Sequence, residues 1–286
     1  MMTTPTRRGW SATLVLLFSA LALSACSFLK KQPDGPRAAP ALPNPQVLLL
    51  GEVHDNAQGH KERFDDLRRR VEAGWHPAIA MEQFDQENQA LLTRAQRDCP
   101  DAGCVIRVME GKGWDWELYK PVIDLAIFYR LPLIAANLSR SDASRTVRDG
   151  VKTTFDAAAV QAYRLNDALP ADIVAGQQKE IIAGHCNMLP DMMVGGMVHA
   201  QIARDIWMAK LIRAQAPNDV VLIAGNGHVR KDFGVARWLN EIAPKLTIRS
   251  VAYLEQAGPH DAAAFDVVHL IKAQQRPDPC AKFNVK

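Results

Sequence analysis

Beyond its first 26 residues, the 286-residue chain lacks any apolar run of the roughly 18 residues that a membrane-spanning helix needs. It also lacks a His-Glu-x-x-His helix, a cysteine pair at metal-ligand spacing and a Gly-x-Ser-x-Gly turn. These absences disfavour a fixed catalytic zinc and a nucleophilic serine. Strong charge of one sign is missing too, since 34 basic residues face 31 acidic ones. No nucleic-acid partner is therefore expected.

The amino terminus predicts export and a lipid anchor. Arg7 and Arg8 precede a short apolar stretch from Leu14 to Leu23, as in a secretory signal of residues 1–25. Leu23-Ser24-Ala25-Cys26 resembles the lipobox of bacterial lipoproteins, in which Cys26 becomes the lipidated first residue. Ser27, not Asp, follows it, which by resemblance to lipoprotein sorting signals implies the outer membrane of a Gram-negative cell envelope.

After the signal segment, the sequence predicts a linker, a core made of two segments, and a helical interval between those segments. Residues 26–45 read as a proline-rich linker, which would hold a globular part of about 240 residues off the membrane. Residues 46–138 and 218–272 alternate between apolar strands and helices and predict an α/β core with a mainly parallel sheet. Residues 139–217 show helical patterns only and predict an inserted all-helical subdomain.

Four cysteines remain after Cys26. In an exported protein, Cys99 and Cys104 are close enough in sequence to form a disulfide across the turn at Pro100 and Gly103. Cys186 follows His185 and reads either as a ligand or as a buried thiol.

Polar side chains recur where the predicted core strands end. They follow or close the strands expected at 47–50, 77–83, 131–138 and 219–224, and they are Glu52, His54, Glu82, Asn137, Asn226 and His228. The carboxyl ends of parallel strands meet at one edge of a sheet, which is where ligands bind in open α/β folds. Carboxylates and imidazoles gathered at that edge suit acid and base chemistry or a divalent metal.

The helical interval contains two further features. His185 follows Gly184 between two expected helices, where it could be a ligand or a structural residue. The helix expected from 191 to 214 contains Met192, Met193, Met197 and Met208, which suit either a core or a surface for a flat apolar ligand.

Taken in order, several motifs resemble the ChaN-like haem-binding lipoproteins over nearly all of residues 46–271. The motifs are LLLGEVHDN, AMEQF, WELYKPVIDLA, AANLSR, GHCNMLPDMM with HAQIARDIWMA, and AGNGHVRKDFGVARWL. The resemblance implies an α/β domain with a helical subdomain, lipid anchoring, and a role in haem or iron acquisition. The family resemblance is also compatible with a homodimer. The sequence motifs that contain His54 and His228, together with Glu82, are more distantly similar to the motifs of Tiki-type metalloproteases and erythromycin esterases. Only Val53 separates Glu52 from His54, where the esterase motif has two residues.

Two functions follow from these patterns. In the first, haem is the ligand and its iron is bound by one of four residues at or near the helical interval, namely Tyr119, Tyr163, His185 or His199. In the second, the cluster at the sheet edge is a hydrolase centre that uses a divalent metal or a general base, with Glu52, His54, Glu82 and His228 as catalytic residues. The family resemblance favours the first.

Overall fold

The computed structural model describes residues 43–109, 113–258, 261–278 and 280–281. The signal segment, Cys26 and the linker up to residue 42 lie outside them. No helix in these ranges is both long and apolar enough to cross a bilayer.

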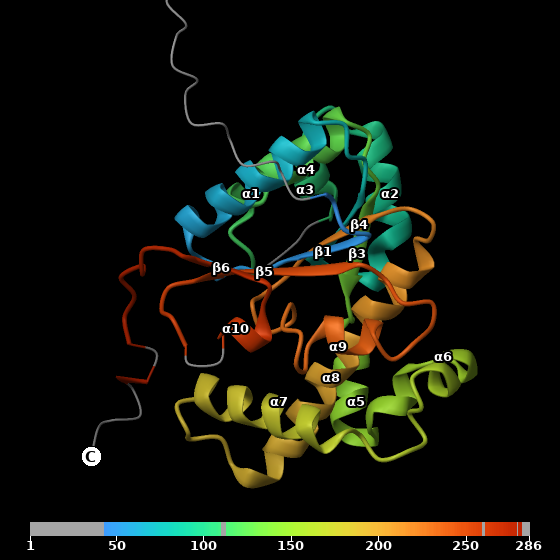
Figure 1. The fold of residues 1–286 in the computed structure, drawn as a ribbon, viewed down its shortest axis with the longest axis vertical. Helices are drawn as coiled ribbons and strands as arrows, with labels where there is room; N and C mark the ends of the chain where they lie inside the picture. Colours follow the sequence, from blue (N-terminus) through green and yellow to red (C-terminus); the bar gives the residue numbers. More distant parts are fainter. Residues whose placement is uncertain (1–42, 110–112, 259–260, 279, 282–286) are drawn as a thin grey trace, which may run out of the picture. The chain divides into compact units, whose positions relative to one another are not determined.

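Six parallel strands form one sheet, which confirms the predicted α/β class. Its spatial order is β3-β2-β4-β1-β5-β6 (Figure 1). The strands are β1 (Val47–Leu50), β2 (Ala78–Asp85), β3 (Leu133–Asn137), β4 (Val220–Ile223), β5 (Ile248–Leu254) and β6 (Val267–Leu270). Each lies within two residues of its predicted bounds, which for the last two strands are 247–254 and 265–271, because apolar runs mark buried strands strongly.

Helices cover both faces of the sheet, as its continuous apolar strands require (Figure 1). One face packs against α1 (Ala57–Glu72), α2 (Gln89–Asp98), α3 (Ala102–Met109) and α4 (Lys120–Phe128), with short 3₁₀ turns at Gln86–Asn88 and Trp116–Leu118. Leu48 and Leu50 of β1 point into this core, whereas Val47 and Leu49 point into the opposite one.

The opposite face packs against the helices that follow β3. They are α5 (Arg140–Asp149), the 3₁₀ turn Val151–Thr154, α6 (Ala157–Ala162), α7 (Ala171–Gly184) and α8 (Asp191–Ala214), joined later by α9 (Val235–Leu239) and α10 (Asp261–Ala264). The predicted helix at 191–214 matches α8, but α6 and α9 are shorter than the helices that the sequence predicts at 157–169 and 232–243. Ile202 and Ile206 of α8 share one hydrophobic core with Leu49 of the sheet. The division into core and insert stays a prediction.

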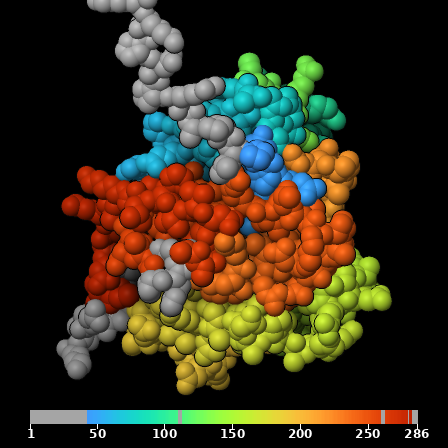
Figure 2. Space-filling view, in the orientation of Figure 1, coloured from blue at the N-terminus to red at the C-terminus, as the bar shows by residue number. Residues whose placement is uncertain are grey.

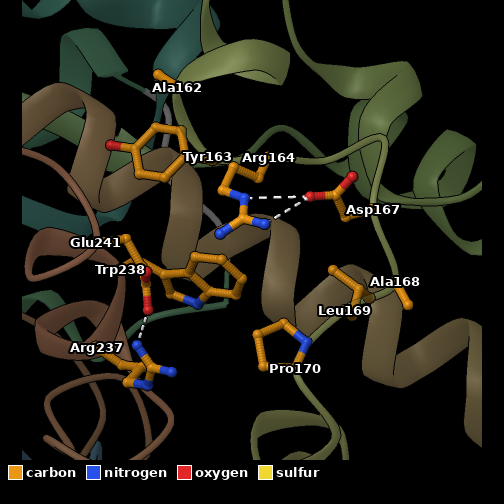
Figure 3. Close-up of a pocket in the computed structure, with 10 residues that line it drawn as sticks. All are labelled: Ala162, Tyr163, Arg164, Asp167, Ala168, Leu169, Pro170, Arg237, Trp238 and Glu241. Carbon is orange, nitrogen blue, oxygen red and sulfur yellow. Dashed lines mark hydrogen bonds and ion pairs between the residues drawn. The ribbon is translucent and has the colours of Figure 1, made fainter.

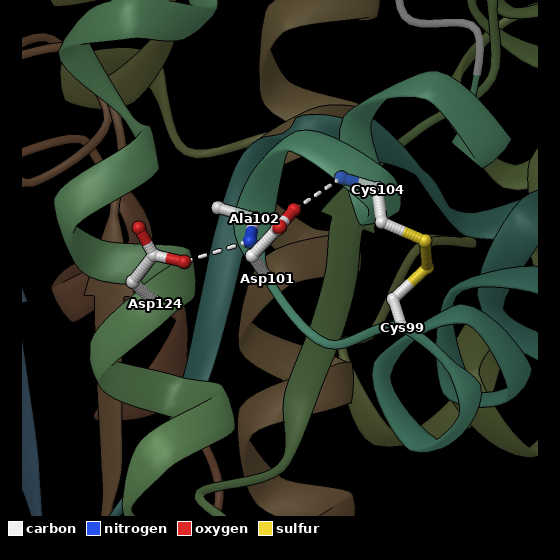
Figure 4. Close-up of a disulfide and its surroundings, with 5 residues drawn as sticks. All are labelled: Cys99, Asp101, Ala102, Cys104 and Asp124. Carbon is white, nitrogen blue, oxygen red and sulfur yellow. Dashed lines mark hydrogen bonds between the residues drawn. A yellow bond between two sulfur atoms is a disulfide. The ribbon is translucent and has the colours of Figure 1, made fainter.

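Two disulfides close loops in the chain. Cys99 pairs with Cys104, as predicted, at the turn between α2 and α3. Figure 4 shows this turn held further by Asp101 Oδ1, which accepts from Cys104 N at 2.8 Å, and by Asp124 Oδ1, which accepts from Ala102 N at 2.7 Å. Cys186 is neither a ligand nor a free buried thiol, because it pairs with Cys280. Sequence spacing gave no sign of this pair, since the two cysteines are 94 residues apart.

Candidate functional site

The sheet order explains why the predicted polar residues meet. Strand β4 lies between β1 and β2, and its Ile223 is in register with both Leu50 and Met81. The residues that follow these three positions therefore emerge side by side at the carboxyl edge. They include Glu52 and His54 after β1, Glu82 within β2, and Gly225 to His228 after β4.

Glu52 is at the centre of a buried hydrogen-bond network. Its side chain is 1% exposed and forms an ion pair with Arg63 of α1. Its Oε1 accepts from Tyr119 OH at 2.6 Å and from Gln83 Nε2 at 3.1 Å, and lies 2.8 Å from His54 Nδ1. With four polar neighbours around it, the carboxylate is fixed in position.

Arg63 is buried as deeply as its partner, and burial lowers its pKa to about 10. Its Nη2 donates to His60 Nδ1 at 3.0 Å, while His60 Nε2 donates to the His54 carbonyl at 3.0 Å. Burial also lowers the pKa of His60, so this ring is neutral, as its acceptor role toward Arg63 requires.

A second buried group links β2 and β4 to α8. His228 Nδ1 lies 2.6 Å from Asp205 Oδ1, and its Nε2 lies 3.5 Å from Glu82 Oε1. Gln177 Nε2 of α7 donates to Asp205 Oδ2 at 2.8 Å, and Glu82 Oε2 accepts from Gly225 N at 2.8 Å. All the members of this group are more than nine-tenths buried.

The pKa values of this second group indicate that it contains a positive and a negative charge side by side. Burial alone would lower the pKa of His228, but Glu82 and Asp205 raise it to about 10. Burial alone would raise the pKa of Glu82, but His228 lowers it to about 2. For Asp205 burial prevails and raises the pKa to about 6. His228 is thus an imidazolium and Glu82 a carboxylate at neutral pH.

His54 is the member of the two groups that reaches solvent. Its side chain is 47% exposed, and its ring packs edge-on against Trp114 at 5.0 Å. A Cβ at Gly225 would lie 3.1 Å from His54 Nε2 and 3.8 Å from Glu82 Oε2. The glycine leaves room for these two side chains to approach each other.

Two of the predicted residues serve the fold instead. Asn226 Nδ2 donates to the Tyr253 carbonyl at 2.8 Å, and its Oδ1 accepts from Tyr253 N at 3.1 Å, so its side chain extends the sheet pairing to β5. Asn137 Oδ1 accepts a hydrogen bond from Arg204 of α8. Among the described residues, no group of three or more His, Cys, Asp or Glu side chains is placed to hold a metal ion. The structure thus gives the divalent-metal alternative no support.

Comparison with known proteins identifies the family. Residues 38–239 match the family described as haem-binding uptake, Tiki superfamily, ChaN. This match covers more than half of the sequence. The chain belongs to the ChaN family.

A solved ChaN of Campylobacter jejuni, described as showing cofacial heme binding, has the same fold. It is 21% identical with a TM-score of 0.61, and the match covers 78% of this chain and 86% of that one. An erythromycin esterase mutant in its open conformation is similar at 15% identity and a TM-score of 0.44, over 73% and 70% of the two chains. No curated protein matches the sequence.

For a ChaN family member, the four predicted iron ligands fall into two classes. Tyr119 is fully buried and its hydroxyl already donates to Glu52. Tyr163 is 6% exposed, packs against Trp238, and has its pKa raised to about 12 by burial. Both tyrosines are thus held in the protonated form within the protein, which does not favour a tyrosinate ligand.

Tyr163 does line a cavity, which Figure 3 shows between Trp238 and the loop from Arg164 to Pro170. Its volume is about 260 Å³. Pockets for drug-sized ligands run to about 300–1,000 Å³, so this cavity is too small to enclose a porphyrin.

The two histidines, in contrast, are accessible. His185 is exposed at the carboxyl end of α7, where its Nδ1 lies 2.7 Å from the Ile181 carbonyl. His199 is half-buried on α8.

Sequence reasoning did not find Arg63, Gln83, Gln177 or Asp205. The sequence did contain a signal for two of these residues, Arg63 and Asp205. Arg63 belongs to the buried stripe of α1, which consists of His60, Arg63, Leu67 and Val71. Asp205 belongs to the buried stripe of α8, which contains Val198, Ile202, Asp205, Ala209 and Ile212. A charged residue within an apolar stripe at helical spacing predicts a buried ionic partner.

Proposed function

We propose that this chain is a lipid-anchored haem-binding protein of haem or iron acquisition, and that haem binds at the turn between α7 and α8. Membership of the haem-binding uptake family is the observation that carries the proposal. Haem is treated as the cargo of the protein.

The surface around this turn has the chemistry that a porphyrin needs. Among the described residues, four of the seven large hydrophobic side chains that are exposed lie on this turn or beside it, and we call them the methionine face: Val147 (43% exposed), Met188 (58%), Met192 (91%) and Met193 (51%). Figure 2 shows the turn as the yellow-brown projection at the lower edge of the protein. Soluble proteins seldom expose large apolar side chains together without a ligand or a partner. Thioethers adapt well to a flat apolar surface.

The geometry of α8 places an imidazole beside these side chains. Met192, Gly195 and His199 are three and four residues apart and therefore share one stripe of the helix. Apart from the adjoining backbone of α8 and the two neighbouring residues, no described atom lies within 4 Å of where a Cβ of Gly195 would be, so this side of the helix is open to a flat ligand. A Cβ at Gly196 would touch Val147 at 2.8 Å, which brings α5 alongside this stripe. Arg148, exposed and next to Val147, can pair with a propionate.

His199 and His185 are therefore the proposed iron ligands, in place of the two buried tyrosines. Titrating hemin into the purified protein should give a shifted Soret band. His199→Ala or His185→Ala should change that band, or weaken affinity by tenfold or more, about 1.4 kcal/mol.

The matched control is His76→Ala, which removes an exposed histidine whose Nδ1 lies 3.0 Å from the Gly74 carbonyl, far from α8 in sequence. It should bind hemin as the wild type does. A Soret shift that survives in the His185→Ala/His199→Ala double variant would contradict the assigned ligands, and no shift in the wild type would contradict haem binding itself.

The lipid anchor has a separate test. Cys26→Ser should leave an unlipidated precursor that no longer fractionates with outer membranes. Recovery of the variant in that fraction at the wild-type level would count against the anchor.

A further inference from the structure

The end of α7 has a backbone conformation that is unusual for the residues found there. The amide of Cys186 donates to the Ala183 carbonyl at 3.1 Å, and the amide of Asn187 donates to the Ile182 carbonyl at 3.0 Å. These two bonds form the Schellman motif, which ends a helix with a residue in the left-handed region. Cys186 has a φ of 61° and Asn187 a φ of 55°.

Glycine is the usual residue at the position that Cys186 occupies, because a Cβ there lies too close to the following carbonyl oxygen. Asparagine tolerates the left-handed region, but cysteine is not among the residues that favour it. A residue keeps such a conformation where the surrounding structure fixes it. In this turn the constraint is covalent, because Cys186 is bonded to Cys280.

The other contacts of the turn are local. In the part of the chain that the structure describes, every hydrogen bond of residues 185–190 is made within five positions along the chain, such as that from Met188 N to the His185 carbonyl at 3.0 Å. None of these six side chains is buried, and Leu189 alone packs partly against a hydrophobic core. An element with so few contacts is easily loosened. The disulfide is thus its main attachment to the rest of the fold.

The other end of the disulfide belongs to a segment that is fixed to the sheet. Ile271, which follows β6, is buried, and its amide donates to the Leu254 carbonyl at 2.9 Å. Arg276, shortly before the bonded cysteine, forms ion pairs with Asp55 at 2.5 Å and Glu255 at 2.6 Å. The disulfide therefore connects the turn to loops that follow β1 and β5.

We propose that the Cys186–Cys280 disulfide is a positioning device for haem binding. It keeps Cys186 in the left-handed conformation and so fixes the backbone that carries His185 and Met188. A turn that is ordered before binding loses less conformational entropy when the ligand binds, and the affinity for haem therefore depends on the disulfide. This inference rests on the proposed haem site. Both cysteines act through their neighbours, since neither sulfur is a ligand.

Hemin titration of the full chain tests the inference. Replacing both residues, Cys186→Ser with Cys280→Ser, gives the serine variant, which should bind hemin about tenfold or more weakly. Its fold should be retained, because neither residue belongs to the two hydrophobic cores, and circular dichroism checks this. The matched control, Cys99→Ser with Cys104→Ser, removes the disulfide between α2 and α3 and should bind hemin as the wild type does.

A second readout separates positioning from a general loss of stability. Adding His185→Ala to the serine variant should weaken hemin binding much less than the same change does in the wild type, because the ring is no longer held in place. Adding His199→Ala should keep its full effect, since the buried residues of α8 fix that helix without the disulfide. Full further losses from both changes would indicate a structural role only and would overturn the proposal.

A glycine variant tests the backbone conformation itself. Cys186→Gly with Cys280→Ser also lacks the disulfide, but glycine adopts the left-handed region without a steric cost. This variant should recover part or all of the affinity that the serine variant loses. If the serine variant does not fold, the wild type reduced with a water-soluble phosphine, and freed of it before titration, gives the same comparison.

The wild-type titration distinguishes this inference from the haem site on which it rests. An absent Soret shift in the wild type overturns both. A wild-type shift with the same hemin affinity in the serine variant or the reduced protein overturns the positioning role alone, and haem binding stands. A glycine variant that binds as weakly as the serine variant also overturns the positioning role.

Discussion

The buried pair of Glu52 and Arg63 gives the most direct test of the network behind His54. Both side chains are 1% exposed, so neither charge has access to water when its partner is removed. Removing one member of a buried ion pair costs about 3–5 kcal/mol, because an uncompensated charge remains inside the protein. Replacing Arg63 and replacing Glu52 should not lower the free energy of unfolding by the same amount.

Arg63→Met leaves Glu52 with three neighbours that can still donate to it, Tyr119, Gln83 and His54. Its cost should therefore be near the lower limit, about 3 kcal/mol. Glu52→Leu leaves the Arg63 guanidinium with the neutral His60 ring as its hydrogen-bond acceptor among the described residues. Its cost should approach about 5 kcal/mol, since a buried cation with one hydrogen bond is poorly compensated.

Urea unfolding followed by circular dichroism measures both losses, read from midpoints at unchanged slope. For a domain of this size, about 3–5 kcal/mol corresponds to a fall in Tm of roughly 6–20 °C. The double variant should cost less than the sum of the two, because it removes both charges together.

Arg68→Met is the matched control on the same helix. Arg68 is 46% exposed and lies 3.2 Å from Asp65, so its loss should cost at most about 1 kcal/mol. Equal, small losses for Arg63→Met and Arg68→Met, with additive costs in the double variant, would refute the assignment of a buried ionic network.

Two further predictions concern the rest of the fold. The Glu82 pKa of about 2 lies below its ordinary 4.5, so the stability it contributes is complete above about pH 4.5 and is lost as pH falls toward 2. The His228 pKa of about 10 lies above its ordinary 6.5, so its contribution is complete below about pH 6.5 and is lost as pH rises toward 10. Urea unfolding measured across this pH range should show both changes of stability in the wild type and weaker changes in Glu82→Gln. Identical dependences of stability on pH in the two proteins would contradict the pairing of Glu82 with His228. For the disulfides, chain entropy predicts a loss of about 4.7 kcal/mol when Cys186 and Cys280 both become Ser, against about 2 kcal/mol for Cys99 and Cys104, because the closed loops differ in length. A larger loss from the shorter loop, measured in the same assay, would argue against that account.

Local pattern was sufficient to predict much of this protein. The buried strands were visible as aliphatic runs, and α8 matched its predicted bounds because its apolar residues recur at helical spacing. The convergence of Glu52, His54, Glu82 and His228 also followed from sequence, since parallel strands bring their carboxyl ends to one edge. The Cys99–Cys104 disulfide followed from the short spacing of the two cysteines and from the expectation that the chain is exported.

Tertiary structure decided what these residues do. Arg63 and Asp205 come from helices on opposite faces of the sheet, and no spacing along the chain reveals that they contact Glu52 and His228. Packing also buried Tyr119 and Tyr163 while it left His185 exposed, although the sequence offered all three equally as candidate iron ligands. The physical reason is that strand position is set by local hydrophobic pattern, whereas the partner and the exposure of a polar side chain depend on which elements pack over it.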